Sequence, residues 1–192
     1  MQVKIIGAGL AGCEAALWLA DRGVQVELYE QKPTKYSPAH KSAGFAELIC
    51  SNSLKAARIG SAAGMLKEEM RILGSITMEA AAHTDVSAGG ALAVDREKFS
   101  DYITEKINAH PLITVIHERV DEIPQGKVII ASGPLTESHL AQSIAKLCGE
   151  EYLSFFDAAA PIVTFESLDQ DKVFFAARYG RGEDDYINCP MD

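Results

Sequence analysis

The sequence predicts an α/β fold whose N-terminal part is a Rossmann-like dinucleotide-binding domain. Three observations predict it: a strand, turn, helix and strand pattern over residues 3–31, a G-x-G-x-x-G spacing at the first turn, and a carboxylate where the second strand ends. Glycine permits a tight turn at Gly7, close approach of a diphosphate at Gly9 and helix packing at Gly12. We therefore expect a diphosphate to contact the backbone of the turn formed by Gly7, Ala8, Gly9, Leu10, Ala11 and Gly12.

The elements of this unit follow from its apolar spacing. Residues 3–6 form a short buried strand, and a helix over residues 13–22 ends at Gly23, a residue type common just after helices. Residues 24–30 alternate apolar and polar side chains as a second strand, which ends at Glu30. A carboxylate at this place favours a free ribose diol over a 2′-phosphate. The alternative is that the glycines only make a tight turn between strand and helix.

Composition indicates an ordinary globular protein. The chain has 192 residues, of which 47% are apolar and 23% charged, without an apolar run that would span a membrane and without a signal peptide. Its four cysteines lack metal-ligand spacing, so we expect a reduced, cytoplasmic protein without a metal site. A net charge of −9 argues against a broad nucleic-acid surface but leaves room for a local basic patch.

A loop over residues 32–41 follows the second strand and contains Lys32, Lys35 and Lys41. Because it lies just past the predicted ribose site, its lysines either contact phosphates or a polyanionic substrate, or are solvated surface. The next stretch, residues 45–55, carries Cys50 inside an apolar run that leads into a small polar turn over residues 51–53. Cys50 is either a buried small side chain or a reactive thiol whose thiolate the N–H groups of that turn stabilise.

Two helices are predicted in the middle of the chain. In residues 62–73 the apolar side chains share one face, which we expect to face the core: Met65, Leu66, Met70 and Leu73. Residues 83–90 are expected to form a polar loop and residues 91–94 a short strand. Asp95 is expected to cap a helix that continues to Ala109 and buries Phe99, Ile103 and Ile107.

A further strand over residues 113–120 and another over residues 128–131 complete the nucleotide-binding part. The latter ends in a second turn of small residues. A second close approach of backbone is expected where a long cofactor crosses the end of a sheet, which favours FAD over NAD. The additional candidate contacts are Val120, Ala131, Ser132 and Gly133. Thr136 is expected to cap a helix that ends at Cys148.

From residue 151 onward the pattern changes to short strands, expected over residues 153–156, 162–165 and 173–177. An acidic run at residues 183–185 is expected to be a solvated turn. We therefore predict an FAD-binding domain over residues 1–150 and the beginning of a second, strand-rich domain, inserted for substrate binding, over residues 151–192. The chain ends without a closing element, which indicates a piece of a longer protein.

Six segments together resemble the folate- and FAD-dependent tRNA (uracil-54-C5) methyltransferases, relatives of the glucose-inhibited division protein A family. The first and fourth segments are shared by many flavoproteins of the glutathione reductase type, whereas the second, fifth and sixth are more specific. The six are GAGLAGCEAA (7–16), LICSNSLK (48–55), VDREKFS (94–100), ASGPLT (131–136), FFDAAAPIV (155–163) and YINCPM (186–191).

The resemblance implies an activity. In that family NAD(P)H reduces FAD, 5,10-methylenetetrahydrofolate delivers a one-carbon unit, and the reduced flavin supplies the electrons that complete a methyl group on the T-loop uridine of tRNA. Uracil C5 becomes nucleophilic only after a thiolate adds at C6, so a cysteine must attack the base. Cys50 matches the family's cysteine beside the flavin. The family's other functional cysteine lies in a Gly-Cys-Pro-Ile-Glu type motif that this chain lacks, and Cys189 is assigned no catalytic role.

Two alternatives remain at this point. The sister family that modifies wobble uridines shares the flavin motif, but its cysteine segment differs from LICSNSLK at residues 48–55. A non-catalytic FAD-binding module would bind flavin tightly and turn over no uridine.

Overall fold

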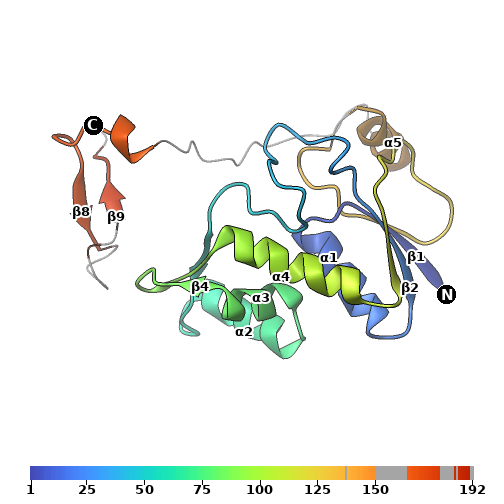
Figure 1. Ribbon diagram of the computed structural model, residues 1–192, viewed down its shortest axis with the longest axis horizontal. Coiled ribbons are helices and arrows are strands. Elements are labelled where there is room, and N and C mark those ends of the chain that lie inside the picture. Colours follow the sequence, from blue (N-terminus) through green and yellow to red (C-terminus); the bar gives the residue numbers. More distant parts are fainter. Residues whose placement is uncertain (137, 150–163, 178–183, 185, 191–192) are drawn as a thin grey trace.

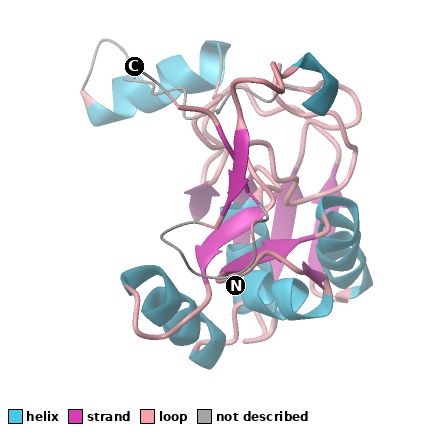
Figure 2. Ribbon diagram, turned by 90° about the vertical axis from the view of Figure 1, so that its left-hand side faces the viewer, coloured by secondary structure: helices cyan, strands magenta, loops and turns pink. Residues whose placement is uncertain are grey.

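The computed structural model describes residues 1–136, 138–149, 164–177, 184 and 186–190. Its centre is a four-stranded parallel sheet in the order β6-β2-β1-β7 (Figures 1 and 2). The four strands are β1 (Gln2–Ile6), β2 (Gln25–Tyr29), β6 (Ile113–Ile116) and β7 (Val128–Ile130). In the register of β1, Ile5 lies beside Leu28 on one side and Ile129 on the other. Because the strands are parallel, the turns after all four lie at one edge of the sheet.

Two helices pack against this sheet, and both were predicted. Helix α1 (Leu10–Ala20) begins three residues earlier than expected, directly after Gly9, and buries only small side chains: Gly12, Cys13, Ala16 and Ala20. Helix α4 (Arg96–Ala109) is capped by Asp95, whose carboxylate accepts from the backbone N–H groups of Glu97 and Lys98. Its predicted stripe of Phe99, Ile103 and Ile107 is fully buried. Apolar residues at these spacings are removed from water when the helix lies on the sheet, which stabilises both elements.

A second layer contains an antiparallel sheet in the order β3-β5-β4, with β3 (Ser53–Ala56), β4 (Asp85–Val86) and β5 (Ala91–Val94). Of these strands the sequence predicted only β5. Helix α3 (Ile76–His83) was also missed, although Ser75 caps it locally by accepting from the Met78 N–H at 3.3 Å. Its start has a distant partner as well. The Glu14 carboxylate on α1 accepts from the backbone N–H groups of Ile76 and Thr77 and pairs with the Ser75 hydroxyl. No local pattern contains a contact across that many residues.

Helix α2 (Ala62–Ile72) lies where expected, but its predicted core-facing side is wrong. Met65, Leu66 and Leu73 are 53%, 57% and 71% exposed. The helix instead approaches the chain before it through Gly64, where an added Cβ would lie 1.8 Å from the Arg58 carbonyl oxygen. This small face allows close packing, so the bulky side chains point outward.

The C-terminal part begins with α5 (Ser138–Cys148), followed by a 3-10 turn (Phe165–Ser167) and a hairpin of β8 (Phe174–Ala176) and β9 (Tyr186–Asn188). The predicted strand over residues 153–156, half of that over 162–165, and two residues of the acidic run lie outside the described residues. The described half of the second strand, Thr164 and Phe165, leads into the 3-10 turn instead. Among the helices of the described part, none is long and apolar enough to cross a bilayer. The division into domains at residue 150 stays a prediction.

Candidate cofactor-binding site

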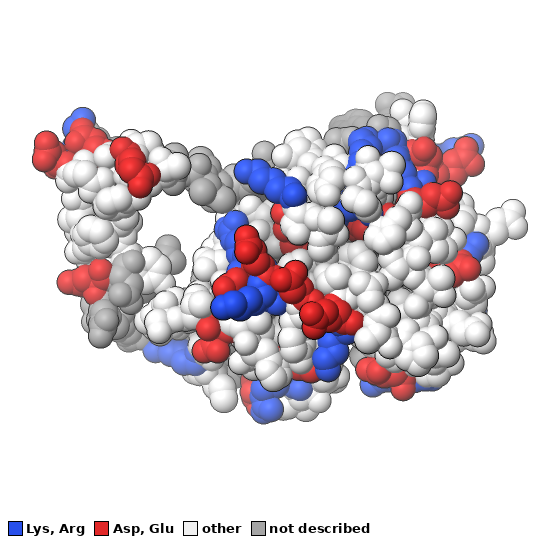
Figure 3. All heavy atoms as spheres, viewed as in Figure 1, with Lys and Arg blue, Asp and Glu red and all other residues white. Residues whose placement is uncertain are grey.

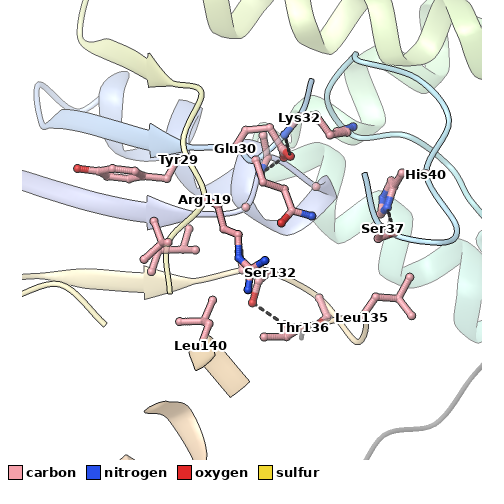
Figure 4. Close-up of a pocket in the computed structure, with 18 of the residues that line it drawn as sticks. Tyr29, Glu30, Lys32, Ser37, His40, Arg119, Ser132, Leu135, Thr136 and Leu140 are labelled. Carbon is pink, nitrogen blue, oxygen red and sulfur yellow. Dashed lines mark hydrogen bonds between the residues drawn. The ribbon is translucent and has the colours of Figure 1, made fainter. Parts of the chain in front are cut away.

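A cavity of about 310 Å³ opens at the edge of the parallel sheet where the strands end (Figure 4). It lies between the turns that follow β1 and β7, where the strand order reverses, which is the usual ligand position in such sheets. Ten of the eleven residues predicted to contact the cofactor line it: Gly7, Ala8, Gly9, Leu10, Ala11, Glu30, Val120, Ala131, Ser132 and Gly133. Gly12 does not line it.

The three glycines of the first turn have different surroundings. An added Cβ at Gly7, whose φ is +100°, would lie 2.6 Å from the Ala131 carbonyl oxygen, so the two turns of small residues lie against each other. A Cβ at Gly12 would lie 1.8 Å from the Gly7 carbonyl oxygen. At Gly9 it would meet no heavy atom within 4 Å. Gly7 and Gly12 are therefore required by the packing of the chain itself, whereas Gly9 leaves open space beside the cavity.

The first turn of α1 points its N–H groups at this space, since a helix leaves its first N–H groups without partners inside the helix. Their partial positive charge favours an anion such as a diphosphate. Next to them, burial raises the pKa of the Cys13 thiol to about 12, with the Glu30 carboxylate as the second cause. Cys13 is therefore an uncharged, buried packing residue at neutral pH, whose sulfur lies 3.4 Å from the Ala8 carbonyl oxygen.

Glu30 is only 7% exposed and is held rigidly at the end of β2. One carboxylate oxygen accepts from the Ala8 N–H at 3.0 Å and the other from the Lys32 N–H at 2.9 Å. Each oxygen retains acceptor capacity, so the carboxylate can also receive the hydroxyls of a ribose. The Ala8 N–H, which the sequence assigned to the diphosphate, is directed instead to Glu30.

Lys32 corrects the view that the three loop lysines are equivalent surface cations. Its side chain is buried, donates to the Gly44 carbonyl and lies 3.8 Å from the Glu47 carboxylate. The other oxygen of Glu47 accepts from the N–H groups of Lys41 and Ser42. Lys32 and Glu47 thus fasten the loop around the cavity, and Lys32 is excluded from any exposed RNA-binding surface.

Replacing Lys32 with methionine should lower the free energy of unfolding by about 1–3 kcal/mol, because the buried Oε2 atom of the half-buried Glu47 carboxylate would lose its cation. Urea unfolding of the full-length protein followed by circular dichroism measures this change. Lys41→Met is the control, since Lys41 is exposed and should change stability by about 0.5 kcal/mol or less. Equal effects of the two substitutions would contradict a structural role for Lys32.

Several cavity residues were missed by the sequence analysis because they carry no motif. Ser37 and His40 pair through Oγ and Nδ1 at 2.6 Å on the wall formed by the loop. Burial and the nearby Lys32 lower the pKa of His40, so its imidazole is neutral at pH 7. In Figure 4 Arg119 reaches from the end of β6 toward Ser132. The only sequence signal for these residues was their place in the segments that follow β2 and β6.

Thr136 also lines the cavity, and its predicted role as a helix cap is wrong. It lies two residues before α5, its hydroxyl donates to the Gly133 carbonyl at 2.7 Å, and it lies 2.7 Å from the Ser132 hydroxyl. These contacts close the second turn of small residues, which has φ of +75° at Gly133. The side chain therefore shapes the wall of the cavity.

Cys50 is exposed, so the interpretation of it as a core residue is wrong. Cys50 does not itself line the cavity, but the preceding residue, Ile49, does. The Arg96 guanidinium donates to the Cys50 carbonyl at 3.3 Å. The N–H of Ser53, expected to be available to a thiolate, instead donates to the Ser51 hydroxyl at 3.0 Å. The polar turn is thus present, but one of its amides is already paired.

The segment that leads to Cys50 is attached to the nucleotide-binding turn. The Ala46 N–H donates to the Ala8 carbonyl at 2.9 Å, and the Phe45 ring beside it is fully buried. Helix α4 holds the same segment through Ser100, which donates to the Phe45 carbonyl, and Thr104, which accepts from the Phe45 N–H. The position of Cys50 relative to the cavity is therefore determined by contacts from α4 and from the first glycine turn.

Comparison with protein families matches residues 2–192 to the family described as glucose inhibited division protein A. The chain belongs to this family. Among curated relatives, proteins of Desulforamulus reducens and Acetivibrio thermocellus are 62% and 59% identical over 100% and 99% of the chain. Both are named methylenetetrahydrofolate--tRNA-(uracil-5-)-methyltransferase TrmFO, and the chain covers 44% of each. It thus spans less than half the length of these relatives.

Solved structures show the same fold. The chain superposes on GidA of Aquifex aeolicus with a TM-score of 0.52 at 19% identity, covering 65% of this chain and 20% of that one. FqzB matches with a TM-score of 0.50 at 15% identity, covering 78% and 39% of the two chains. Together with the parallel sheet and its switch point, these similarities confirm the predicted Rossmann-like fold. Among the described residues, no group of His, Cys, Asp and Glu side chains has the arrangement of a metal site.

Proposed function

We propose that this chain is the N-terminal, FAD-binding part of a folate-dependent tRNA methyltransferase that methylates C5 of the T-loop uridine. The observation that carries the proposal is the adjacency of a dinucleotide cavity and an exposed cysteine: Ile49 lines the cavity, and Cys50 follows it. The names of relatives at 57–62% identity support the same reaction. 5,10-Methylenetetrahydrofolate is the proposed carbon donor and NAD(P)H the proposed reductant.

Three features of the chain fit FAD. The space beside Gly9 admits a diphosphate at the N-terminus of α1. The buried Glu30 carboxylate can accept hydrogen bonds from ribose hydroxyls. A second turn of small residues at 131–133 allows the backbone to approach the cofactor closely at another point. Bound FAD supplies reducing equivalents for the conversion of a one-carbon unit to a methyl group. The residues of this chain bind and orient it: Gly9 by absence of a side chain, Glu30 by hydrogen bonding, and the backbones of Val120 and Ala131 by lining the site.

Cys50 is proposed to act as one of the functional thiols of the reaction. A thiolate that adds to uracil C6 makes C5 nucleophilic, and its later departure restores the ring. Cys50 suits this better than Cys13, because Cys13 is buried with a raised pKa whereas Cys50 is exposed beside the cavity. We further propose that residues 1–150 form the cofactor domain, that residues 151–192 begin a second domain, and that the enzyme works in the cytoplasm.

The test is release of tritium from a T-loop uridine labelled at C5, catalysed by the full-length protein with FAD, NADPH and methylenetetrahydrofolate. Methylation must remove the C5 hydrogen, so one tritium is released for each methyl group formed. Wobble-labelled tRNA in a parallel reaction distinguishes the sister modification, for which only that substrate would react. Tight FAD with no release from either substrate would support a non-catalytic module and contradict the proposal.

A further inference from the structure

Charge is distributed unevenly over the described part of this acidic protein, whose net charge is −9. In Figure 3 acidic side chains form a stripe on the face of the molecule over α4. Its members are one helical turn apart and exposed: Glu97, Asp101 and Glu105. A polyanion is repelled from such a stripe, so an RNA that reaches Cys50 has to approach from another side.

Cations gather instead where β3 leads into α2. Lys55 and Arg58 are exposed, and Lys67 on α2 donates to the carbonyls of Ala56 and Ala63 at 3.1 and 3.0 Å. Burial and the neighbouring Lys55 charge lower the pKa of Lys67, so the two ammonium groups lie close enough to repel each other. None of these three cations has an ion pair with a described acidic residue, unlike Arg71, which pairs with Glu68.

The same surface leads to Cys50. Arg96 donates to the Cys50 carbonyl. Next to it, the Val94 N–H donates to the Asn52 carbonyl and the Asn52 side-chain amide donates to the Val94 carbonyl, which joins this segment to β5. Lys55 lies five positions after Cys50, a distance of at most about 18 Å along an extended chain. Arg96 and Lys55 therefore lie within a few nucleotides' length of the candidate thiol, and Lys67 lies at the Ala56 carbonyl next to Lys55.

We propose that the surface formed by Lys55, Arg58, Lys67 and Arg96, the β3–α2 cation surface, binds the phosphodiester backbone of the substrate RNA beside Cys50. This inference rests on the proposed function and assigns it an RNA-contact surface. Lysine and arginine at this spacing neutralise successive phosphates without reading bases, which positions an RNA strand. A uridine turned out of such a strand would then reach the thiol.

Acids also lie near this surface: Glu68 pairs with Arg71, whereas Glu69 and Glu97 are exposed. Two others are directed away or lie farther off. Asp95 directs its carboxylate to the first N–H groups of α4 and pairs with Lys98 at 3.2 Å. Asp85 lies on β4, the opposite edge strand of the sheet β3-β5-β4, and so lies about 10 Å from β3. Lys32, one of the loop lysines that could have contacted a polyanionic substrate, is excluded as an RNA contact because its side chain is buried.

The experiment compares two full-length variants that each lose three positive charges. Lys55→Gln/Arg58→Gln/Lys67→Gln removes three members of the surface, and Lys127→Gln/Lys146→Gln/Lys172→Gln removes exposed lysines elsewhere. Binding of T-loop tRNA is followed by fluorescence anisotropy between about 50 and 200 mM salt, a range in which phosphate contacts dominate the salt dependence. FAD content, measured by absorbance, should be normal in both, because neither set lines the cavity.

We expect the first variant to bind tRNA at least about tenfold more weakly and to lose about 2 from the slope of log K against log salt, corresponding to its three cations. The control should retain the wild-type slope. An unchanged slope in the first variant, or an equal change in the control, would contradict RNA binding by the β3–α2 cation surface. Tritium release by the wild-type protein would in that case still support the proposed function. Absence of tritium release in the wild type would overturn the proposed function and the surface with it.

Discussion

Replacing Cys50 with alanine should lower single-turnover methylation of T-loop uridine by on the order of 10³-fold or more, while FAD binding remains normal. Among the described residues, the other cysteine near the cavity, Cys13, cannot take over this role, because it is buried and burial raises its pKa to about 12. Stability should change by about 0.5 kcal/mol or less, because Cys50 is exposed and removal of its sulfur leaves no cavity. The measurement is rapid-quench methylation by enzyme with a full complement of FAD.

The control is Cys148→Ala, since Cys148 is also exposed but lies at the end of α5 and does not line the cavity. It should methylate at the wild-type rate. A rate for Cys50→Ala within a few-fold of wild type would remove this thiol from the reaction. Loss of FAD by Cys50→Ala would instead show that the residue serves the cofactor site.

Substitution by valine should lower stability at Gly12 but FAD affinity at Gly9. Gly12→Val should destabilise the protein by about 3 kcal/mol or more, because its Cβ would overlap the Gly7 carbonyl and both groups are backbone-fixed. Gly9→Val should change stability by about 1 kcal/mol or less, since its Cβ meets no protein atom and Gly9 has an ordinary extended φ of −74°. It should nevertheless weaken FAD binding on the order of 100-fold, about 3 kcal/mol, by filling the space for the diphosphate.

Thermal unfolding and fluorimetric titration with FAD of the two full-length variants separate these effects. The apoprotein should be used for unfolding, so that FAD bound to the native state does not add to stability. Stoichiometric FAD in purified Gly9→Val would contradict the diphosphate site. A cooperative, wild-type melting curve for Gly12→Val would contradict the close packing of α1 on the turn.

Prediction succeeded where the physical cause lies within a few residues. Asp95 caps the helix that follows it, and Phe99, Ile103 and Ile107 recur at helical spacing, so both the start and the buried face of α4 could be predicted. The turn after β1 could also be predicted, because its three glycines lie within six residues of one another. Helix α3 was missed although Ser75 caps it locally, and its other N-terminal partner, Glu14, lies more than sixty residues away in the chain.

Burial was the property that local pattern predicted least well. The apolar face of α2 resembles that of any core helix, but Gly64 allows closer packing than Met65 or Leu66, and the smaller face is the one that is buried. Lys32 shows the reverse: a loop lysine is usually solvated, but Glu47 and the Gly44 carbonyl supply partners that make its burial possible. Both outcomes depend on groups that the neighbouring sequence does not contain.

The sequence by itself determined the parallel α/β fold, the two turns of small residues and the carboxylate at the end of β2, because glycine spacing and apolar periodicity act over short distances. Only the tertiary structure decided that Gly7 lies against Ala131, that Glu30 binds the Ala8 N–H, and that Cys50 is exposed beside the cavity. These relations arise when strands far apart in the chain pair side by side. The site is therefore a property of the sheet edge, at which four separate segments of the chain meet.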